Sequence, residues 1–426
     1  MRIALWLVGL FAVAVAAALF AGNNPGSITV FWPPYRVDLS LNLVLVLLLL
    51  GFLTLHLAWR ALAVLLALPR EARSWRLRQR ERSMQQALLD ALSNLVAGRF
   101  VRAKKAAESV LAQVRVIEAD GDSLGYASRL QAVSHLLAAE AAHALQDRQA
   151  REHHRQAALA RAGEGAVPPE TREGVQLRAA RWALDDRDAT AALQMLDELG
   201  QGAARRTLAL RMRLKAARMA QRTLAGLETA RVLAKHRALS PVAAEGVLRG
   251  LAIELITGAH DPAQLQKAWA DLDASERGMT DVALHAAERL HALGGDQIMG
   301  RQWLLPVWER MVAHADALSP QQAVQMVRVL ERGFSGATGA PDGAWLARIE
   351  AAQMQNPGDP VLQYLAGVTC MRLQLWGKAS QLLTQALSRM QDAGLRRDAW
   401  RLLAELADRN GDMAAAAQAW RNAAQG

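Results

Sequence analysis

The chain has 426 residues, enough for two or three domains; 52% of them are hydrophobic but only 5% are aromatic, and the net charge is +10. With only 6 Phe and 3 Tyr, the residues that fill β-sandwiches and β-barrels are scarce, while abundant Ala, Leu, Gln, Glu and Arg favour helix. The single cysteine, Cys370, excludes a disulfide scaffold and a cysteine-based zinc site, and we expect it to be a small core residue.

Two apolar segments near the N-terminus are predicted to span a membrane. Ile3 to Ala21 has no charged residue, and Leu41 to Trp59 is rich in leucine. A 19-residue helix is about 28 Å long, close to a hydrocarbon core of roughly 30 Å. A cleaved signal peptide is the alternative for the first segment, but a second span so close behind it favours an uncleaved helical hairpin.

The loop between the two spans, residues 22–40, is predicted to contain a short β-hairpin. It opens with the turn sequence Asn24-Pro25-Gly26, after which residues 27–32 have the composition of a strand. Pro33-Pro34 then favours a turn, and residues 35–39 are a candidate return strand.

A cluster of arginines follows the second span. Trp59 and Arg60 form a predicted interfacial anchor, residues 61–68 are expected at the level of the lipid headgroups, and Pro69 is expected to break or bend the chain. The predicted lipid-facing residues are Trp59, Arg60, Arg70, Arg73, Arg76 and Arg78, followed by Arg80 and Arg82. Because the loop between the spans has no net charge, the positive-inside rule places both termini in the cytoplasm.

The positive charge of the chain points to a membrane rather than to nucleic acid. Residues 1–82 carry a net charge of +6, which leaves +4 for the remaining 344 residues. Each arginine near an anionic leaflet gains about 1 kcal/mol, so anionic lipids are expected partners. The sequence shows no basic face with interleaved aromatic residues, and no nucleic-acid partner is expected.

From Ser83 to Gln425 apolar residues recur at three- and four-residue steps, which predicts helices throughout. In each of the last two helix pairs, a second small residue follows the first after twelve positions, and a third follows after seven more. This spacing fits a tetratricopeptide pattern of about 34 residues. The predicted packing residues there are Gly367, Ala379 and Ala386 in one pair, and Trp400, Ala404, Ala416 and Trp420 in the next. Asn410-Gly411-Asp412 is the turn of the last pair.

Earlier copies of the pattern are less regular. Ala138, Ala150 and Ala157 keep the offsets, Ala91 and Ala103 keep them in part with Val110 at the last position, and Ala180, Ala192 and Leu196 fit marginally. Between Ala204 and Gly333 the pattern predicts helices without a convincing register.

These observations predict an all-α chain, in which a two-helix transmembrane hairpin is followed by a tetratricopeptide-like α-solenoid. The groove of such a solenoid is expected to bind helices or extended peptides. The expected regions are a membrane hairpin (1–69), an Arg-rich juxtamembrane helix (70–86), degenerate repeats (87–332) and C-terminal repeats (344–426).

The sequence offers little that indicates catalysis or metal binding. It lacks a dinucleotide fingerprint, a P-loop, a G-x-S-x-G elbow and an H-E-x-x-H helix, so no catalytic or metal residue is predicted. His153 and His154 are adjacent and would point about 100° apart on a helix, which disfavours binding one metal together. His135 and His143 share a helix face, but each histidine is expected at a helix surface, and Trp303 and Trp308 are expected in the core.

The N-terminal organisation resembles the HemY family of proteobacterial inner-membrane proteins. The carrying features are the two spans, the arginine cluster, Ala87-Leu88-Leu89 running into Ala97-Gly98-Arg99-Phe100, and the segment from Leu136 to Ala142. The resemblance implies a non-enzymatic protein of the inner membrane that organises or regulates the terminal enzymes of haem synthesis, with no cofactor of its own. Two other roles stay open: a haem- or porphyrin-binding carrier, and a general envelope adaptor unrelated to haem.

Overall fold

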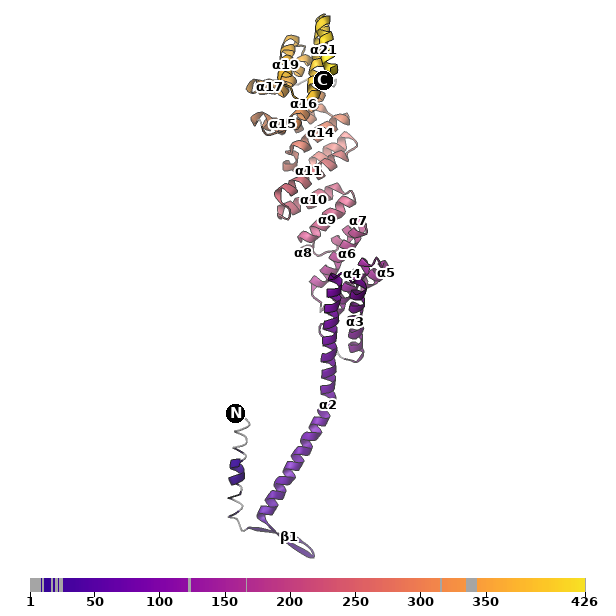
Figure 1. Ribbon diagram of the computed structural model, residues 1–426, viewed down its shortest axis with the longest axis vertical. Coiled ribbons are helices and arrows are strands. Elements are labelled where there is room, and N and C mark those ends of the chain that lie inside the picture. The colour runs from indigo at the N-terminus through magenta and orange to yellow at the C-terminus, as the bar shows by residue number, and fades with distance from the viewer. Residues whose placement is uncertain are drawn as a thin grey trace. The chain divides into compact units, whose positions relative to one another are not determined.

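The computed structural model describes residues 9, 11–16, 18–19, 22, 26–121, 124–165, 167–314, 316–334 and 343–425, without the side chains of residues 64–74. The chain separates into two compact units, Met1–Val167 and Pro168–Gly426 (Figure 1). The elements of the first unit are β1 (Ser27–Trp32), β2 (Tyr35–Ser40), α2 (Leu41–Val96), α3 (Phe100–Ala119), α4 (Ala127–Ala144) and α5 (Arg148–Ala162).

The predicted β-hairpin between the two apolar segments is confirmed. Strands β1 and β2 pair antiparallel, with Ser27 opposite Ser40 and Trp32 opposite Tyr35, and Pro33-Pro34 forms the turn. Local signals sufficed here because turn-forming prolines separate two short runs with strand composition.

Helix α2 begins directly after the hairpin and continues for 56 residues. The Ser40 side chain caps its first turn by accepting a hydrogen bond from the backbone N–H of Leu43, at 3.3 Å. The helix passes through Pro69, so of the two outcomes predicted there, a break or a bend, the break is wrong. A proline removes one backbone hydrogen bond, and the helix-forming residues on both sides sustain the helix across that loss. Most of the first predicted span, Ile3–Ala21, lies outside the described residues.

The C-terminal part of α2 packs with α3 and α4 in a small core. Met84 on α2 is buried against Val110, Val114 and Ile117 on α3. A second cluster joins Ala91 and Ala107 to Ala138 and Leu137 on α4. Therefore α2 contains both the apolar segment and the first helix of the first helical pair.

The described residues of the second unit have no β-strand, and most consecutive helices pack against one another (Figure 1). Its elements are α6 (Pro169–Asp185), α7 (Ala189–Asp197), α8 (Gln201–Ala204), α9 (Thr207–Met219), α10 (Thr223–Lys235), α11 (Pro241–Thr257), α12 (Pro262–Ala270), α13 (Ala274–Arg277), α14 (Thr280–Ala292), α15 (Gln297–Ala313), α16 (Pro320–Gly333), α17 (Gly343–Gln355), α18 (Pro360–Arg372), α19 (Trp376–Arg389), α20 (Ala393–Arg409) and α21 (Met413–Gln425).

A continuous apolar core extends through most of this unit, from Leu227 to Leu406. Cys370 is 1% exposed within it, as predicted. Trp308 is 2% exposed and meets Trp345 edge to face, and Trp303 stacks on Trp269 with ring centroids 4.7 Å apart. The core placement expected for both tryptophans is therefore confirmed, although Trp303 is only half-buried.

In the described part of the chain, seven helix pairs share one turn geometry, in which the second helix begins two or three residues after the turn residue. In each turn one residue has a positive φ, and the next backbone N–H donates to the carbonyl five residues before it, which satisfies the end of the first helix. These turn residues are Gly98, Gln146, Arg187, Gln221, Gly294, Gln374 and Gly411. The shared turn defines a common register for all seven pairs.

Candidate functional site

The segment Leu41–Ala63 of α2 is long and apolar enough to cross a membrane. Its mean hydropathy is 2.4, and its most apolar stretch buries none of its residues in the protein. Large side chains such as Leu49 and Phe52, each 71% exposed, have no protein packing that would explain them. A lipid environment would satisfy this surface.

The predicted interfacial residues lie at the expected end of this segment. Trp59 is 72% exposed and Arg60 is exposed beside it; Arg76 and Arg78 are exposed further along α2. The side chains of Arg70 and Arg73 lie outside the described residues. Arg80, assigned to the same cluster, forms an ion pair with Asp120 and so joins α2 to the end of α3.

The small residues predicted to pack the C-terminal pairs are buried. Gly367, Ala379, Ala386, Ala404 and Ala416 all lie between helices. A Cβ on Gly367 would lie 2.8 Å from Cγ of Leu383, so α18 and α19 approach too closely there for any side chain.

The two tryptophans of the last pair lie nearer the surface than core residues do. Trp400 is half-buried, and Trp420 is 42% exposed. The indole N–H of Trp420 donates to Asp408 at 3.2 Å, which holds the ring over the end of α20. A tryptophan is large and carries a polar N–H, so it settles where one edge can reach a hydrogen-bond acceptor.

The register proposed for Ala138, Ala150 and Ala157 is shifted by one residue. Ala138 is buried, but Ala150 and Ala157 are only half-buried. The turn residue of this pair is Gln146, so the positions that match Gly367 and Ala386 are Ala139 and Ala158, both fully buried. The run of alanines in α4 hides this shift, because every nearby register places a small residue at the contact.

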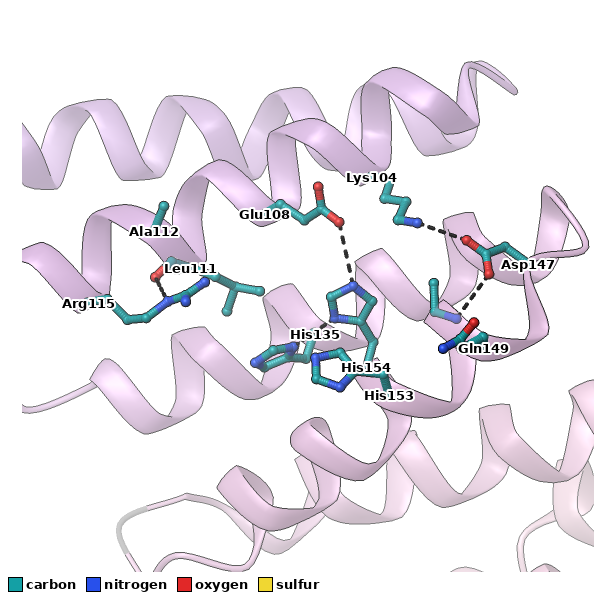
Figure 2. A pocket seen from close by; sticks show the side chains of 11 residues that line it. Lys104, Glu108, Leu111, Ala112, Arg115, His135, Asp147, Gln149, His153 and His154 are labelled. Carbon is teal, nitrogen blue, oxygen red and sulfur yellow. Dashed lines mark hydrogen bonds and ion pairs between the residues drawn. The ribbon is translucent and has the colours of Figure 1, made fainter.

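A groove between α3, α4 and α5 is lined mostly by charged and polar side chains (Figure 2). Its cavity has a volume of about 730 Å³. The lining residues are Lys104, Glu108, Leu111, Ala112, Arg115, His135, Asp147, Gln149, Ala150, His153 and His154. The α3 residues come from the second helix of one pair, and α4 and α5 form the next pair.

The centre of the groove is a pair of histidines. Nδ1 of His135 and Nδ1 of His154 are 3.0 Å apart, so one ring donates and the other accepts. Nε2 of His154 lies 3.7 Å from Glu108, and Lys104 forms an ion pair with Asp147 at 3.1 Å. The expectation of a surface position is wrong for His154, which is 7% exposed because α5 packs that ring against α4.

Burial keeps these imidazoles uncharged at neutral pH. It lowers the pKa of His135 to about 4, with further lowering by the neighbouring His154, His153 and arginine charges. Burial also lowers the pKa of His154, and Glu108 opposes that shift only in part. Among the described residues no three or more His, Cys, Asp or Glu side chains are arranged to hold a metal ion.

Comparison with known families finds one match, in the N-terminal region. Residues 26–146 match the family model described as HemY protein N-terminus. The N-terminal region of this chain is similar to the HemY family. The matched HemY range includes the β1–β2 hairpin, all of α2, α3 and α4, and it ends at the turn residue Gln146.

A search of curated proteins found no match for this chain. Similar solved structures include Naa15/Naa10 bound to HypK-THB, at 12% identity over 76% of this chain and 56% of that one, with a TM-score of 0.25. The APC/C hetero-tetramer Cut9-Hcn1 is 14% identical over 80% of this chain and 66% of that one, with a TM-score of 0.28. The P58(IPK) TPR domain is 13% identical over 77% of this chain and 99% of that one, with a TM-score of 0.23. The chain thus spans less than two thirds of the first two structures. These TM-scores are too low to support a conclusion about this chain. The helical repeats are recognised instead from the seven turns with a shared geometry described above.

Proposed function

We propose that this chain is a membrane-anchored tetratricopeptide-like scaffold that regulates late haem synthesis by holding partner proteins in its repeat grooves. The observation that carries the proposal is the HemY match over residues 26–146, a range in which one helix joins an apolar segment to a helical repeat. The proposed role is non-enzymatic, because the sequence contains no dinucleotide fingerprint, P-loop, G-x-S-x-G elbow or H-E-x-x-H helix.

The continuity of α2 gives this scaffold a physical basis. The apolar segment Leu41–Ala63 and the buried contacts of Met84 and Ala91 belong to the same helix. A partner bound to the repeats is therefore held near the bilayer. Tethering of this kind raises the effective concentration of two bound enzymes to about mM for short linkers, without any new contact between them.

The proposed location is the bacterial inner membrane, with two spans and both termini in the cytoplasm. Ile3–Ala21 supplies the first span, Leu41–Trp59 the second, and the β1–β2 hairpin lies on the periplasmic side. The arginines after Arg60 support this orientation because anionic lipids attract them on the cytoplasmic face. The proposed partners are peripheral or cytoplasmic proteins, the terminal enzymes of haem synthesis among them.

The porphyrin content of a deletion strain tests the haem role. We expect late porphyrin intermediates to accumulate, and the full chain expressed from a plasmid to restore the normal profile. The chain extracted in mild detergent should also retain terminal haem enzymes as partners. A normal profile combined with unrelated partners would contradict the haem role and favour a general envelope adaptor.

The histidine groove favours a second candidate function, that of a haem or porphyrin carrier. His135 and His154 are uncharged imidazoles in a cavity of about 730 Å³, and a neutral imidazole can bind iron. Most lining residues are charged or polar, which suits the faces of a macrocycle poorly, so the scaffold is the better supported role. Titration with micromolar haem tests it: a Soret shift lost in His154→Ala supports a carrier, and no shift contradicts it.

A further inference from the structure

A second basic region lies in the second unit, far along the chain from the arginines that follow the apolar segment. Residues 205–237 contain ten basic residues and one acidic residue, Glu228. All other residues after Arg82 together carry a net charge of −5. The positive charge of the repeats is therefore concentrated on α9, α10 and the turns beside them.

Ion pairs within the fold account for only part of this charge. Arg206 pairs with Glu173 at 2.7 Å, and Arg213 pairs with Asp197 at 2.6 Å. Arg231 pairs with the buried Glu276 at 2.6 Å. These three arginines join neighbouring elements of the unit, and their charge is neutralised there.

Three other basic residues form a stripe along one face of α9. Arg211, Lys215 and Arg218 follow a spacing of four and then three residues, and all three are exposed. Within the described part of the chain none of them has an acidic side chain within 4 Å; Arg211 donates to the backbone carbonyl of Ala238 at 2.8 Å. Because like charges at this spacing destabilise a helix, the fold alone does not explain this cationic stripe.

The cationic stripe borders a cavity with mixed chemistry. The cavity has a volume of about 480 Å³ and is lined by the three stripe residues together with Leu214, Met219 and Glu254. Met219 is 37% exposed at its edge, so an incoming chain meets apolar surface beside the positive charges. Glu254 accepts a hydrogen bond from Thr223 at 3.4 Å and is the one carboxylate among the residues described as lining the cavity.

We propose that the cationic stripe docks an acidic polypeptide segment of a partner protein, with apolar side chains that pack on Leu214 and Met219. Charge complementarity selects the acidic residues, and the apolar floor gives contact area that a bare anion would not use. A nucleic acid fits less well, because the described lining has no aromatic side chain for base stacking and Glu254 repels phosphate. The proposal rests on the proposed function in one respect, that the repeats hold proteins.

Site-specific crosslinking in living cells tests this docking surface. A photoreactive phenylalanine replaces Met219 in the full-length chain, and Met413 on α21, which is 73% exposed, serves as the reference position. We expect a crosslink at position 219 to a protein segment with net negative charge. The triple variant Arg211→Glu, Lys215→Glu and Arg218→Glu should lower its yield by about tenfold.

A matched variant controls for the change of net charge. Lys105→Glu, Lys267→Glu and Arg396→Glu alter three exposed residues on three other helices, and this triple variant should leave the yield within about twofold of the wild type. A synthetic peptide of the crosslinked segment should bind the purified chain with an affinity that falls as salt rises. The same peptide with its acidic residues changed to lysine should bind the triple stripe variant instead.

Each other outcome overturns the docking surface: a crosslink to lipid or nucleic acid, a neutral or basic protein segment, no crosslink above the position 413 reference, or equal losses in both triple variants. The haem role is judged separately, by the identity of the crosslinked protein. An acidic segment from a protein outside haem synthesis would support the docking surface and contradict the proposed function.

Discussion

The Nδ1 atoms of His135 and His154 lie 3.0 Å apart, although the two residues are 19 positions apart in the chain. The rings come from α4 and α5, and burial keeps both in the neutral form. This contact makes the first unit sensitive to acid.

Acidification is expected to destabilise the α3–α5 region. The pKa of His135 is about 4 in the folded chain against 6.5 as its ordinary value, so the unfolded chain binds the proton more tightly. The free energy of unfolding is therefore unaffected by His135 above pH 6.5, and it decreases as the pH falls from 6.5 toward 4. Since the ring is half-buried, we expect a loss of about 1–2 kcal/mol, measured by amide hydrogen exchange in α4 and α5 of the detergent-solubilised chain.

His135→Asn should flatten this pH dependence, because asparagine does not titrate in that range. His236→Asn, which changes an exposed histidine in the second unit, should leave it unaltered. Equal pH dependence of exchange in the wild type and His135→Asn would refute the assignment.

Gly367→Ala is expected to destabilise the second unit by about 1–3 kcal/mol, because the new methyl group would overlap Leu383 on the facing helix. Gly377→Ala is the control, since a Cβ there has nothing within 4 Å and lies in the first turn of α19. It should be neutral or slightly stabilising. Urea unfolding measures both, and equal effects would show that the close contact of α18 and α19 does not form.

Gln374→Gly is expected to stabilise the chain by about 0.5–1 kcal/mol. Gln374 has a φ of 62°, a conformation that glycine adopts without strain. The same substitution at Gln385, an exposed position inside α19, should instead destabilise it by about 1 kcal/mol. Thermal unfolding compares the two, and a lower Tm for Gln374→Gly would contradict the shared turn geometry.

Glu276→Ala is expected to destabilise the second unit by about 3 kcal/mol. The carboxylate is 1% exposed, pairs with Arg231 at 2.6 Å and accepts from the backbone N–H of Asp273 at 2.9 Å. Its removal leaves that N–H without this acceptor and leaves Arg231 with the exposed Asp273 carboxylate, at 3.2 Å, as its remaining ion pair. Glu350→Ala breaks the exposed pair with Lys378 and should cost below about 1 kcal/mol. Similar losses in the two variants, followed by urea unfolding, would argue against the burial of Glu276.

Local sequence signals predicted the elements that local interactions determine. The β1–β2 hairpin followed from the prolines at 33 and 34, and the C-terminal pairs from small residues around Gly411 and its neighbours. Within the stretch Ala204–Gly333, for which no register was predicted, one pair has Gln221 as its turn residue, whereas a left-handed turn is normally recognised by glycine or asparagine.

The groove and the cationic stripe required packing information. No motif links His135 to His154, since their contact depends on how α4 meets α5, and a shift of one residue would separate the rings. The basic residues of α9 are visible in the sequence. The net positive charge of the chain nevertheless pointed to the arginines that follow the apolar segment, because the +4 of residues 83–426 is small for a segment of that length. Only the ion pairs of Arg206, Arg213 and Arg231 reveal which basic residues are left for a partner.

Helix α2 is proposed to anchor the helical repeats to the cytoplasmic face of a membrane. Proteinase added to spheroplasts, followed by carbonate extraction and detection of a tag at the C-terminus, tests it most directly. We expect the repeats to stay intact and to remain in the membrane pellet after carbonate. Digestion of the repeats from outside, or their release by carbonate, would contradict it.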